Sequence, residues 1–413
     1  MGKRVVITGI GVVSPIGIGK NEFWKNLFAG QSGFRDITLF DTKDLKVKIA
    51  GEITNFNPKA ILGEKGLLDL DRATLLLLSA TKLALEDAGL KIDESNTYRT
   101  GVSVGTTFGS LHSISKFDRE SLTEGPRYVN PIIFPNTVAN SPASRISIKF
   151  QIKGFNSTIS TGMSAALDAI DYANDFICLD KADTIVAGAV EDLSMQTFLG
   201  FYKLNYLSGL KNTSAAPLSC PFDNRRNGII FSEGATTLIL QDEEYAKKTG
   251  TVVYAEILGI GSCFDPAKFY KYNPKGYGMK KAMKKALKAA GLFPKDIDCV
   301  FANANSTKDA DYIETKVIKD LFDEYAYKIH VIAVKSALGE SFSVSGGFAT
   351  IAALGALTKG ILPPTINYKE KDKNCDLEYM PNKARNKEVS KIMINSFGPN
   401  GVCTSLIIGR YKS

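Results

Sequence analysis

Histidine and tryptophan are the scarcest residues in this sequence. Its 413 residues include two histidines, His112 and His330, and one tryptophan. Because the two histidines are far apart along the chain, we expect no metal site built on histidine and few candidates for a general base near neutral pH. The six cysteines are scattered, with no CxxC pair and no metal-like cluster. We therefore expect reduced thiols, a cytoplasmic location and no bound metal.

Long apolar runs are also missing. No run approaches the roughly 20 residues that span a bilayer, so we expect no membrane segment. The opening segment MGKRVVITGIGVVSP has no cleavage site and reads as a first strand. Its glycines Gly9 and Gly11 match a dinucleotide fingerprint poorly, because the third glycine and the ribose-binding acid are absent. We expect no cofactor. The net charge of +8 fits an acidic macromolecular partner and does not by itself indicate nucleic acid.

What the sequence does contain is a regular alternation of strand-like and helix-like stretches, which predicts α/β architecture. RVVITGIGVVSP reads as a buried strand, and residues 71–90 read as a helix that ends at a glycine. RTGVSVGTT and DTIVAGAV read as further strands. Between them, STISTGMSAALDAI changes from a strand pattern to a helix pattern at Met163, and the following helix is amphipathic.

The second half of the chain repeats this plan. VVYAEILGIGS is similar to the opening strand, and KKALKAAGLFPKDID is similar to LALEDAGLKIDES, each being followed by a short strand pattern. An internal duplication is the simplest explanation. We therefore predict two related halves, at residues 1–251 and 252–413.

Six segments, in order along nearly the whole chain, resemble landmarks of one protein family. They are RVVITGIGVVSPIG, LDRATLLLLSATKLALEDAGL, GPRYVNPIIFPNT, CPFDNRRNGIIFSEGA, VKSALGES and NSFGPNG. Together they resemble the β-ketoacyl-acyl-carrier-protein synthase family of the thiolase superfamily. The resemblance implies a thiolase fold, in which duplicated βαβαβαββ halves form a five-layer αβαβα sandwich.

The resemblance also implies where catalysis would occur, and there the sequence departs from the family. The nucleophilic cysteine at the helix start falls on Met163, and the two histidines fall on Asn303 and Glu340. A thioether cannot attack an acyl thioester, and an anionic Glu340 would oppose a developing enolate. Lys335 of the second loop is retained. We therefore expect no catalytic residues and no ketosynthase activity from the isolated chain.

The positions that would contact the phosphopantetheine arm match the family pattern only in part. Of two threonines in the family pattern, one is Asn305 while Thr307 remains. In the C-terminal loop the gating phenylalanine falls on Pro399, while Phe397 persists. We take Phe397 and Pro399 as the candidate loop gate.

One branch of the family combines an intact fold with a lost nucleophile: the chain-length factor of type II polyketide synthases. The resemblance implies a heterodimer with a catalytic ketosynthase, a tunnel for the growing chain at the interface, and an acyl carrier protein that delivers the phosphopantetheine-bound chain. An aromatic polyketide product is favoured over an aryl polyene. Candidate tunnel and gating residues are Phe108, Leu111, His112, Ser115, Ile133 and Phe134. The spacing of Phe108, Leu111 and Ser115 predicts one helix face.

Two alternatives remain open from the sequence. The chain is a divergent β-ketoacyl synthase or malonyl decarboxylase with non-standard catalytic groups, or it is an acyl-binding scaffold protein. Neither alternative involves nucleic acid or a membrane.

Overall fold

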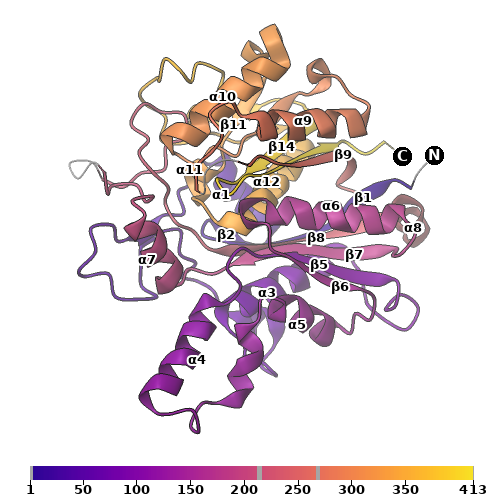
Figure 1. Ribbon diagram of the computed structural model, residues 1–413. Helices are drawn as coiled ribbons and strands as arrows, with labels where there is room; N and C mark the ends of the chain where they lie inside the picture. Colours follow the sequence, from indigo (N-terminus) through magenta and orange to yellow (C-terminus); the bar gives the residue numbers. More distant parts are fainter. Residues whose placement is uncertain (1–2, 212–215, 267–269, 413) are drawn as a thin grey trace.

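The computed structural model describes residues 3–211, 216–266 and 270–412. Over these residues the chain forms two halves with the same order of elements (Figure 1). The first half consists of β1 (Val5–Ser14), α3 (Arg72–Asp87), β5 (Thr100–Gly105), α5 (Ser141–Phe150), β6 (Asn156–Ile159), α6 (Ala165–Cys178), β7 (Thr184–Glu191) and β8 (Gly234–Asp242). The second consists of β9 (Ala255–Phe264), α9 (Tyr277–Ala290), β10 (Cys299–Phe301), α10 (Lys308–Phe322), β11 (His330–Ile332), α12 (Ser345–Lys359), β14 (Lys391–Phe397) and β15 (Val402–Gly409). The predicted duplication is confirmed, whereas the boundary between residues 251 and 252 stays a prediction.

The strand order is also the same in both halves, β6-β5-β7-β8-β1 in the first and β11-β10-β14-β15-β9 in the second. In each half the first three strands are parallel and the last two are antiparallel. The halves meet where β1 pairs with β9, through Val6 with Glu256 and Ile7 with Ala255. The two sheets are therefore joined by hydrogen bonds through their innermost strands.

Helices cover the outer faces of the two sheets and separate their inner faces. One apolar cluster joins α3 and α5 to the first sheet, and a second joins α9 and α10 to the other sheet. A third cluster contains α6, α12 and residues from both sheets. Three apolar contact zones of this kind require five layers, so the predicted αβαβα sandwich is confirmed.

Shorter elements connect these layers. They are β2 (Gly17–Ile18), α1 (Lys20–Phe28), β3 (Arg35–Asp36), β4 (Ile49–Ala50), α2 (Pro58–Leu62), α4 (Leu111–Thr123), the 3₁₀ helix η1 (Pro131–Thr137), α7 (Met195–Lys203), α8 (Glu243–Thr249), α11 (Lys335–Leu338), β12 (Ile361–Leu362) and β13 (Arg385–Asn386). The segment that carries α4 and η1 projects from the body of the molecule beneath α3 and α5 (Figure 1), and we call it the α4 arm.

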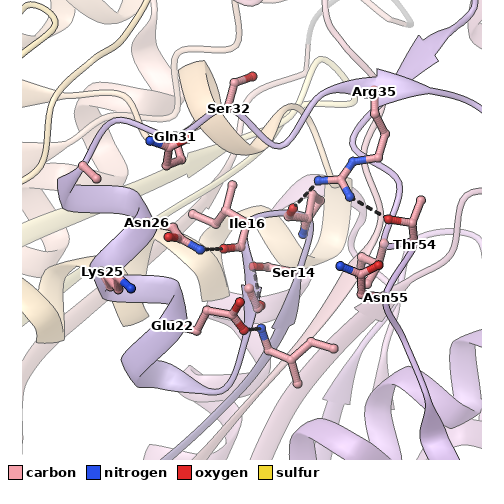
Figure 2. A pocket seen from close by; sticks show the side chains of 15 residues that line it. Ser14, Ile16, Glu22, Lys25, Asn26, Gln31, Ser32, Arg35, Thr54 and Asn55 are labelled. Carbon is pink, nitrogen blue, oxygen red and sulfur yellow. Dashed lines mark hydrogen bonds between the residues drawn. The ribbon is translucent and has the colours of Figure 1, made fainter.

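The exit from β1 surrounds a surface hollow of about 480 Å³ (Figure 2). Two of its polar residues, Arg35 and Asn26, hold the connecting segments together. Arg35 donates hydrogen bonds to Thr54 Oγ1 and to the carbonyl of Pro15, at 2.8 and 2.7 Å. Asn26 Nδ2 donates to the carbonyl of Ile16 at 2.5 Å.

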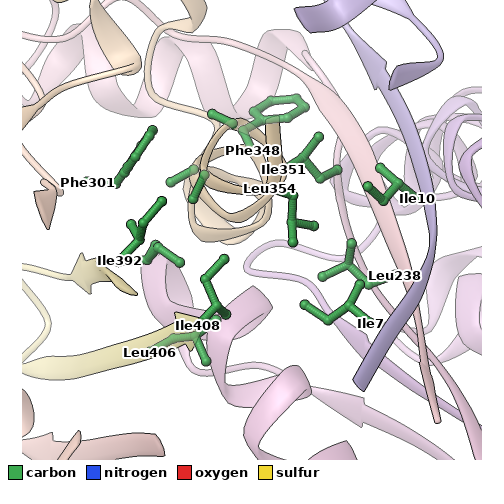
Figure 3. Close-up of a cluster of buried hydrophobic side chains, with 14 of the residues drawn as sticks. Ile7, Ile10, Leu238, Phe301, Phe348, Ile351, Leu354, Ile392, Leu406 and Ile408 are labelled. Carbon is green, nitrogen blue, oxygen red and sulfur yellow. The ribbon is translucent and has the colours of Figure 1, made fainter. Parts of the chain in front are cut away.

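Helix α12 lies at the centre because its sequence is apolar on all sides. Every residue from Ser345 to Leu357 is buried, as expected for a helix with no polar face. Figure 3 shows its side chains between those of the two sheets. The packing is close: a Cβ at Gly347 would lie 2.1 Å from Thr236 Oγ1, and one at Gly355 would lie 2.6 Å from Trp24 Nε1. These two glycines allow the helix to approach its neighbours.

Several local predictions can be compared directly with the structure. The helix predicted at residues 71–90 is α3, whose N-cap Asp71 accepts a hydrogen bond from the Thr74 amide at 2.9 Å. The strand predicted in VVYAEILGIGS begins only at Ala255. All six cysteines are free thiols. Among the described residues, no helix combines the length and apolar character needed to cross a bilayer.

Candidate degenerate acyl-transfer site

Met163 lies at the turn between β6 and α6. After β6 ends at Ile159, a 3₁₀ turn over Gly162–Ser164 leads into the helix. Gly162 has a φ of +79°, a conformation that favours glycine. The Met163 side chain is only 4 % exposed. The predicted change from strand to helix at Met163 is therefore confirmed; we call this turn the elbow, and it places a thioether at the N-terminal end of α6.

Hydrogen bonds tie this elbow to the end of β14 in the other half of the chain. Ser396 Oγ donates to the carbonyl of Met163, and Ser164 Oγ donates to the carbonyl of Ser396, both at 2.8 Å. Asn400 Nδ2 donates to the carbonyl of Thr161 at 3.2 Å. These bonds hold the elbow through its backbone, so its geometry does not depend on the chemistry of the side chain at 163.

Apolar side chains surround Met163. We call this group the Met163 cluster; its buried members include Met163, Leu193, Phe198, Phe201, Phe231 and Phe342, with Phe40 and Phe108 packed against them. The ring centroid of Phe342 lies 4.7 Å from that of Phe201 and 5.1 Å from that of Phe108. Methionine suits such surroundings, because its flexible thioether packs well against aromatic rings.

The other two expected catalytic positions are joined in a buried polar network. Glu340 accepts four hydrogen bonds: Oε1 from the Phe342 amide at 3.1 Å and Ser345 Oγ at 2.8 Å, and Oε2 from Lys335 Nζ at 2.9 Å and Asn305 Nδ2 at 3.1 Å. Glu340 is 1 % exposed. A carboxylate that is buried with a cation and with this number of donors is well compensated.

Lys335 connects the two expected positions. Its ammonium group donates to Glu340 and, at 3.0 Å, to Asn303 Oδ1. Lys335 is 4 % exposed and Asn303 is 2 % exposed. The structure therefore brings Asn303, Glu340 and the retained Lys335 together, at the positions that the family resemblance implied. At the three positions themselves, Met163, Asn303 and Glu340 supply neither a thiol nor an imidazole.

Two further acids, Glu314 and Asp311, support the loop that carries Asn303 and Asn305. Glu314 accepts from the amides of Asn303 and Ala304 at 3.0 and 2.8 Å, and burial raises its pKa to about 7. Asp311 accepts from the Asn305 amide at 2.9 Å, and burial raises its pKa to about 6. Our sequence interpretation missed these residues. Their signal is two acids three positions apart in the helix that follows FANANST.

The predicted tunnel residues of the α4 region lie in different environments. Phe108 precedes α4, which begins at Leu111, so the expectation that Phe108 shares a helix face with Leu111 and Ser115 is wrong. Gly109, with φ +60°, turns the chain before the helix starts. Phe108 contacts the Met163 cluster, Leu111 and Ser115 are half-buried, and His112 is exposed.

Ile133 and Phe134 lie elsewhere, on η1 of the α4 arm. Phe134 is 56 % exposed, and its ring lies 5.8 Å from that of Phe117 on α4. Neither residue belongs to the Met163 cluster.

The residues predicted to gate the C-terminal loop are both buried. Phe397 ends β14 and packs in the cluster beneath α9 and α10, which is a different cluster from that of Met163. Pro399 follows in the loop. Gly398, between them, is the loop residue that approaches Met163: a Cβ there would lie 3.6 Å from the Met163 Cβ.

This fold and these loops can be compared with known proteins. The model of the β-ketoacyl synthase N-terminal domain matches residues 2–246, and that of the C-terminal domain matches residues 254–369. The chain belongs to the β-ketoacyl synthase family. It is 35 % identical over 408 residues to a 3-oxoacyl-[acyl-carrier-protein] synthase 2 of Coxiella burnetii, covering 99 % of both chains. The corresponding Synechocystis synthase is 32 % identical over 411 residues and is covered equally.

Among solved structures, this β-ketoacyl synthase family member is similar to the ishigamide ketosynthase/chain length factor. The two agree with a TM-score of 0.93 and 31 % identity over 100 % of both chains. A type II polyketide synthase ketosynthase in complex with its acyl-carrier protein and bound to a hexaketide agrees with a TM-score of 0.91 and 28 % identity, again over 100 % of both chains.

Proposed function

We propose that this chain is the chain-length factor of a type II polyketide synthase: a non-catalytic subunit that pairs with an active ketosynthase and shapes the tunnel for the growing acyl chain. The observation that carries the proposal is the network around Glu340. Met163 supplies no nucleophile, and the atoms of Glu340 and Lys335 that would face a substrate are bound to each other. The likeness to a ketosynthase/chain length factor supports the same conclusion.

The surface offers suitable features for a ketosynthase partner. Strand β6 is at the edge of the sheet, where its open side can pair with another chain. The α4 arm exposes several large apolar side chains, namely Leu122, Tyr128, Ile132, Phe134 and Val138. Exposed apolar groups gathered on one projecting segment are typical of protein interfaces. In this proposal Ile133 and Phe134 act at the interface, whereas Phe108, Leu111, His112 and Ser115 line or limit the tunnel.

The proposal includes an acyl carrier protein as the source of malonyl units and the carrier of the chain. The structural relative that contains a carrier protein supports this partnership for the complex as a whole. We propose a cytoplasmic complex, with an aromatic polyketide as its product class, and with Phe397 and Pro399 as a loop gate that opens by moving Gly398 away from Met163.

The test uses the protein alone and together with a ketosynthase that contains the family's cysteine and two histidines. We expect a stable heterodimer that extends malonyl units on a carrier protein, and no decarboxylation or condensation by the isolated chain. A heterodimer whose ketosynthase cysteine is replaced by alanine is the matched control and should be inactive. Activity of the isolated chain would instead support the divergent synthase or decarboxylase. Failure to form a complex with any ketosynthase would support the acyl-binding scaffold.

A further inference from the structure

Two cysteines of the second half lie directly opposite each other in an antiparallel strand pair: Cys263 near the end of β9 and Cys403 near the start of β15. The ladder is regular at this position, because its register shift lies between Ile407 and Ile408. Cys403 belongs to the apolar cluster beneath α9, and Cys263 packs against the same cluster. The two thiols therefore share one face of the sheet, as opposite residues of an antiparallel pair do.

The spacing of the two cysteines follows from the hydrogen bonds of the ladder. The Asp265 amide donates to the carbonyl of Gly401 at 2.7 Å, which makes these two residues a hydrogen-bonded pair. Hydrogen-bonded and non-hydrogen-bonded pairs alternate, so Cys263 and Cys403, two positions further in, are a hydrogen-bonded pair as well. The Cα atoms of such a pair are about 5.5 Å apart, within the range of about 4.4–6.8 Å that disulfides join.

The side chains need a small adjustment to form a bond. The Cβ atoms of opposite residues are about 4.5–5.5 Å apart, so they would have to approach by about 1 Å to reach the separation found in disulfides. Each cysteine is one residue from the end of its strand. The adjustment therefore disturbs only the end of the ladder.

The two thiols differ in their access to solvent. Cys403 is 3 % exposed, and burial raises the pKa of its thiol, which the neighbouring Cys263 raises further. Cys263 is half-buried and lines two surface hollows, of about 580 and 630 Å³. Because access controls thiol reactivity, an incoming reagent meets Cys263 first, and Cys403 reacts second.

The larger of these hollows has a cationic wall. Lys280, Lys281 and Lys284 of α9 line it. Lys280 lies 3.7 Å from Asp320, whereas Lys281 and Lys284 are exposed and their amines have no partner among the described residues. The carboxylate of Asp265, in the same wall, is hydrogen-bonded within the protein. This hollow therefore favours an anionic ligand beside Cys263.

The smaller hollow has the opposite character. Asp168, Asp171 and Asp175 of α6 line it together with Lys285. Lys285 Nζ donates to the carbonyl of Ser262 at 2.7 Å. Three carboxyl groups against one amine disfavour an anion on this side, so an anionic reagent would reach Cys263 from the α9 side.

We propose that Cys263 and Cys403 form a reversible intrachain disulfide by exchange with an anionic low-molecular-weight disulfide, such as glutathione disulfide, that binds in the hollow beside α9. This modification site goes beyond the proposed function and does not depend on it. The free thiols of the structure are its reduced state.

Two exchange steps complete the reaction. Cys263 Sγ loses its proton to water and attacks one sulfur of the glutathione disulfide, whose S–S bond breaks and releases one glutathione. Cys403 Sγ then loses its proton and attacks the Cys263 sulfur of the mixed disulfide, releasing the second glutathione. The two cysteines lose two electrons and two protons, and the two glutathione thiols gain them. The proximity of Cys403 favours this second step despite its raised pKa.

The bond would join the end of β9 to the start of β15, directly after the loop that contacts the elbow. In that loop, Asn400 Nδ2 donates to the carbonyl of Thr161 at 3.2 Å, and Gly398 approaches Met163. The disulfide therefore restricts the segment that packs on the elbow. Since its Cβ atoms must be drawn together, we expect the bond to be reduced readily.

The experiment treats the isolated, folded full-length chain with a series of glutathione redox buffers. Acid quenching, alkylation in denaturant and peptide mapping by mass spectrometry then identify the state of each cysteine. We expect a peptide cross-linked through Cys263 and Cys403 at high ratios of oxidised to reduced glutathione, and its loss on addition of dithiothreitol. Cys403→Ser should instead accumulate the mixed disulfide of Cys263 with glutathione.

Variants of the hollow test the anionic ligand. Lys281→Gln/Lys284→Gln should slow bridge formation by glutathione disulfide about fivefold at low salt. The rate with the uncharged bis(2-hydroxyethyl) disulfide should not change. Lys288→Gln, on the same helix but outside the lining of the hollow, is the matched control.

Two further controls separate the bridge from other thiol chemistry. Cys178→Ser removes the exposed thiol of α6 and should form the bridge at the wild-type rate. Circular dichroism checks that each oxidised chain is still folded. Glutathione on Cys178 while Cys263 and Cys403 stay alkylatable, or a bridge that forms only in denaturant, would overturn the proposal. A wild-type rate for the double lysine variant would overturn the assignment of the hollow.

Discussion

Lys335 Nζ lies 2.9 Å from Glu340 Oε2, and both side chains are almost completely buried. The same ammonium group holds Asn303. Burying the Glu340 carboxylate without Lys335 would cost free energy of folding. Burying the Lys335 ammonium group without an acid or another acceptor would do the same. The two residues therefore stabilise each other, and by doing so they close the place where the family's histidines would act.

The first prediction concerns this pair. Lys335→Met leaves the Glu340 carboxylate buried without its cation, and we expect the free energy of unfolding at pH 7 to fall by about 3–5 kcal/mol. Urea denaturation measures the change. The double variant Lys335→Met/Glu340→Leu removes both charges and should be more stable than the single variant. A double variant that is as unstable as the sum of the two single variants would show that the pair is not coupled.

The second prediction concerns Met163. Met163→Ala opens a cavity within an aromatic cluster, so we expect a loss of about 2–4 kcal/mol in unfolding free energy. Met163→Leu preserves the volume and should cost less than about 1.5 kcal/mol. Neither substitution should change the affinity for the ketosynthase partner, since the elbow is held by its backbone bonds to Ser396. Destabilisation by Met163→Leu as large as that by Met163→Ala would contradict simple packing.

The third prediction concerns product length. Phe108 packs against Phe201 and Phe342 at the edge of the Met163 cluster. Phe108→Ala should lengthen the products of the heterodimer or broaden their distribution, as measured by mass spectrometry of the released chains. Phe293→Ala truncates an aromatic residue that is 68 % exposed and is the matched control. An unchanged product profile from an intact Phe108→Ala heterodimer would show that Phe108 does not limit the tunnel.

The fourth prediction concerns the α4 arm. Phe134→Ser removes an exposed apolar group from η1 and should weaken co-purification with the ketosynthase about tenfold, because such anchors commonly contribute more than 1 kcal/mol. The melting temperature of the isolated chain should change little. Phe293→Ser changes a comparably exposed residue on another part of the surface. If both variants weaken the complex equally, the arm has no specific part in it.

The fifth prediction concerns pH. Burial, together with the charges of Asp175 and Asp168, raises the pKa of Asp171 on α6 to about 7. The folded chain therefore binds this proton more tightly than the unfolded chain, whose aspartates titrate near a pKa of about 4. The stabilisation from Asp171 is complete below about pH 4 and is lost as the pH rises to about 7.

Asp171→Asn cannot ionise and should lack this part of the pH dependence. At pH 8 we expect the variant to be more stable than the wild type by about 2 kcal/mol, after allowance for partial exposure of the side chain. Urea denaturation of the isolated chain between pH 5 and pH 8 measures this difference. Asp118→Asn, on the exposed face of α4, is the control. If the unfolding free energy of the variant depended on pH as that of the wild type does, the raised pKa of Asp171 would be contradicted.

Much of the fold follows from local patterns. The Asp71 cap and the glycine after α3 are read directly from the chain, because a helix end needs a hydrogen-bonding cap and a residue that tolerates positive φ. The duplication is visible because similar apolar patterns recur in both halves. The start of α4 was harder to predict from the sequence. The spacing of Phe108, Leu111 and Ser115 is helical, yet Gly109 turns the chain before the helix begins.

The sequence by itself determined the family, the layered fold and the loss of the cysteine and both histidines at Met163, Asn303 and Glu340, because each is encoded in a short motif. Only the tertiary structure decided what these replacements do. The hydrogen bonds of Glu340 come from Lys335, Asn305, Phe342 and Ser345, which different segments bring together. These contacts are invisible in the sequence, because burial and the direction of neighbouring side chains depend on distant parts of the chain coming together.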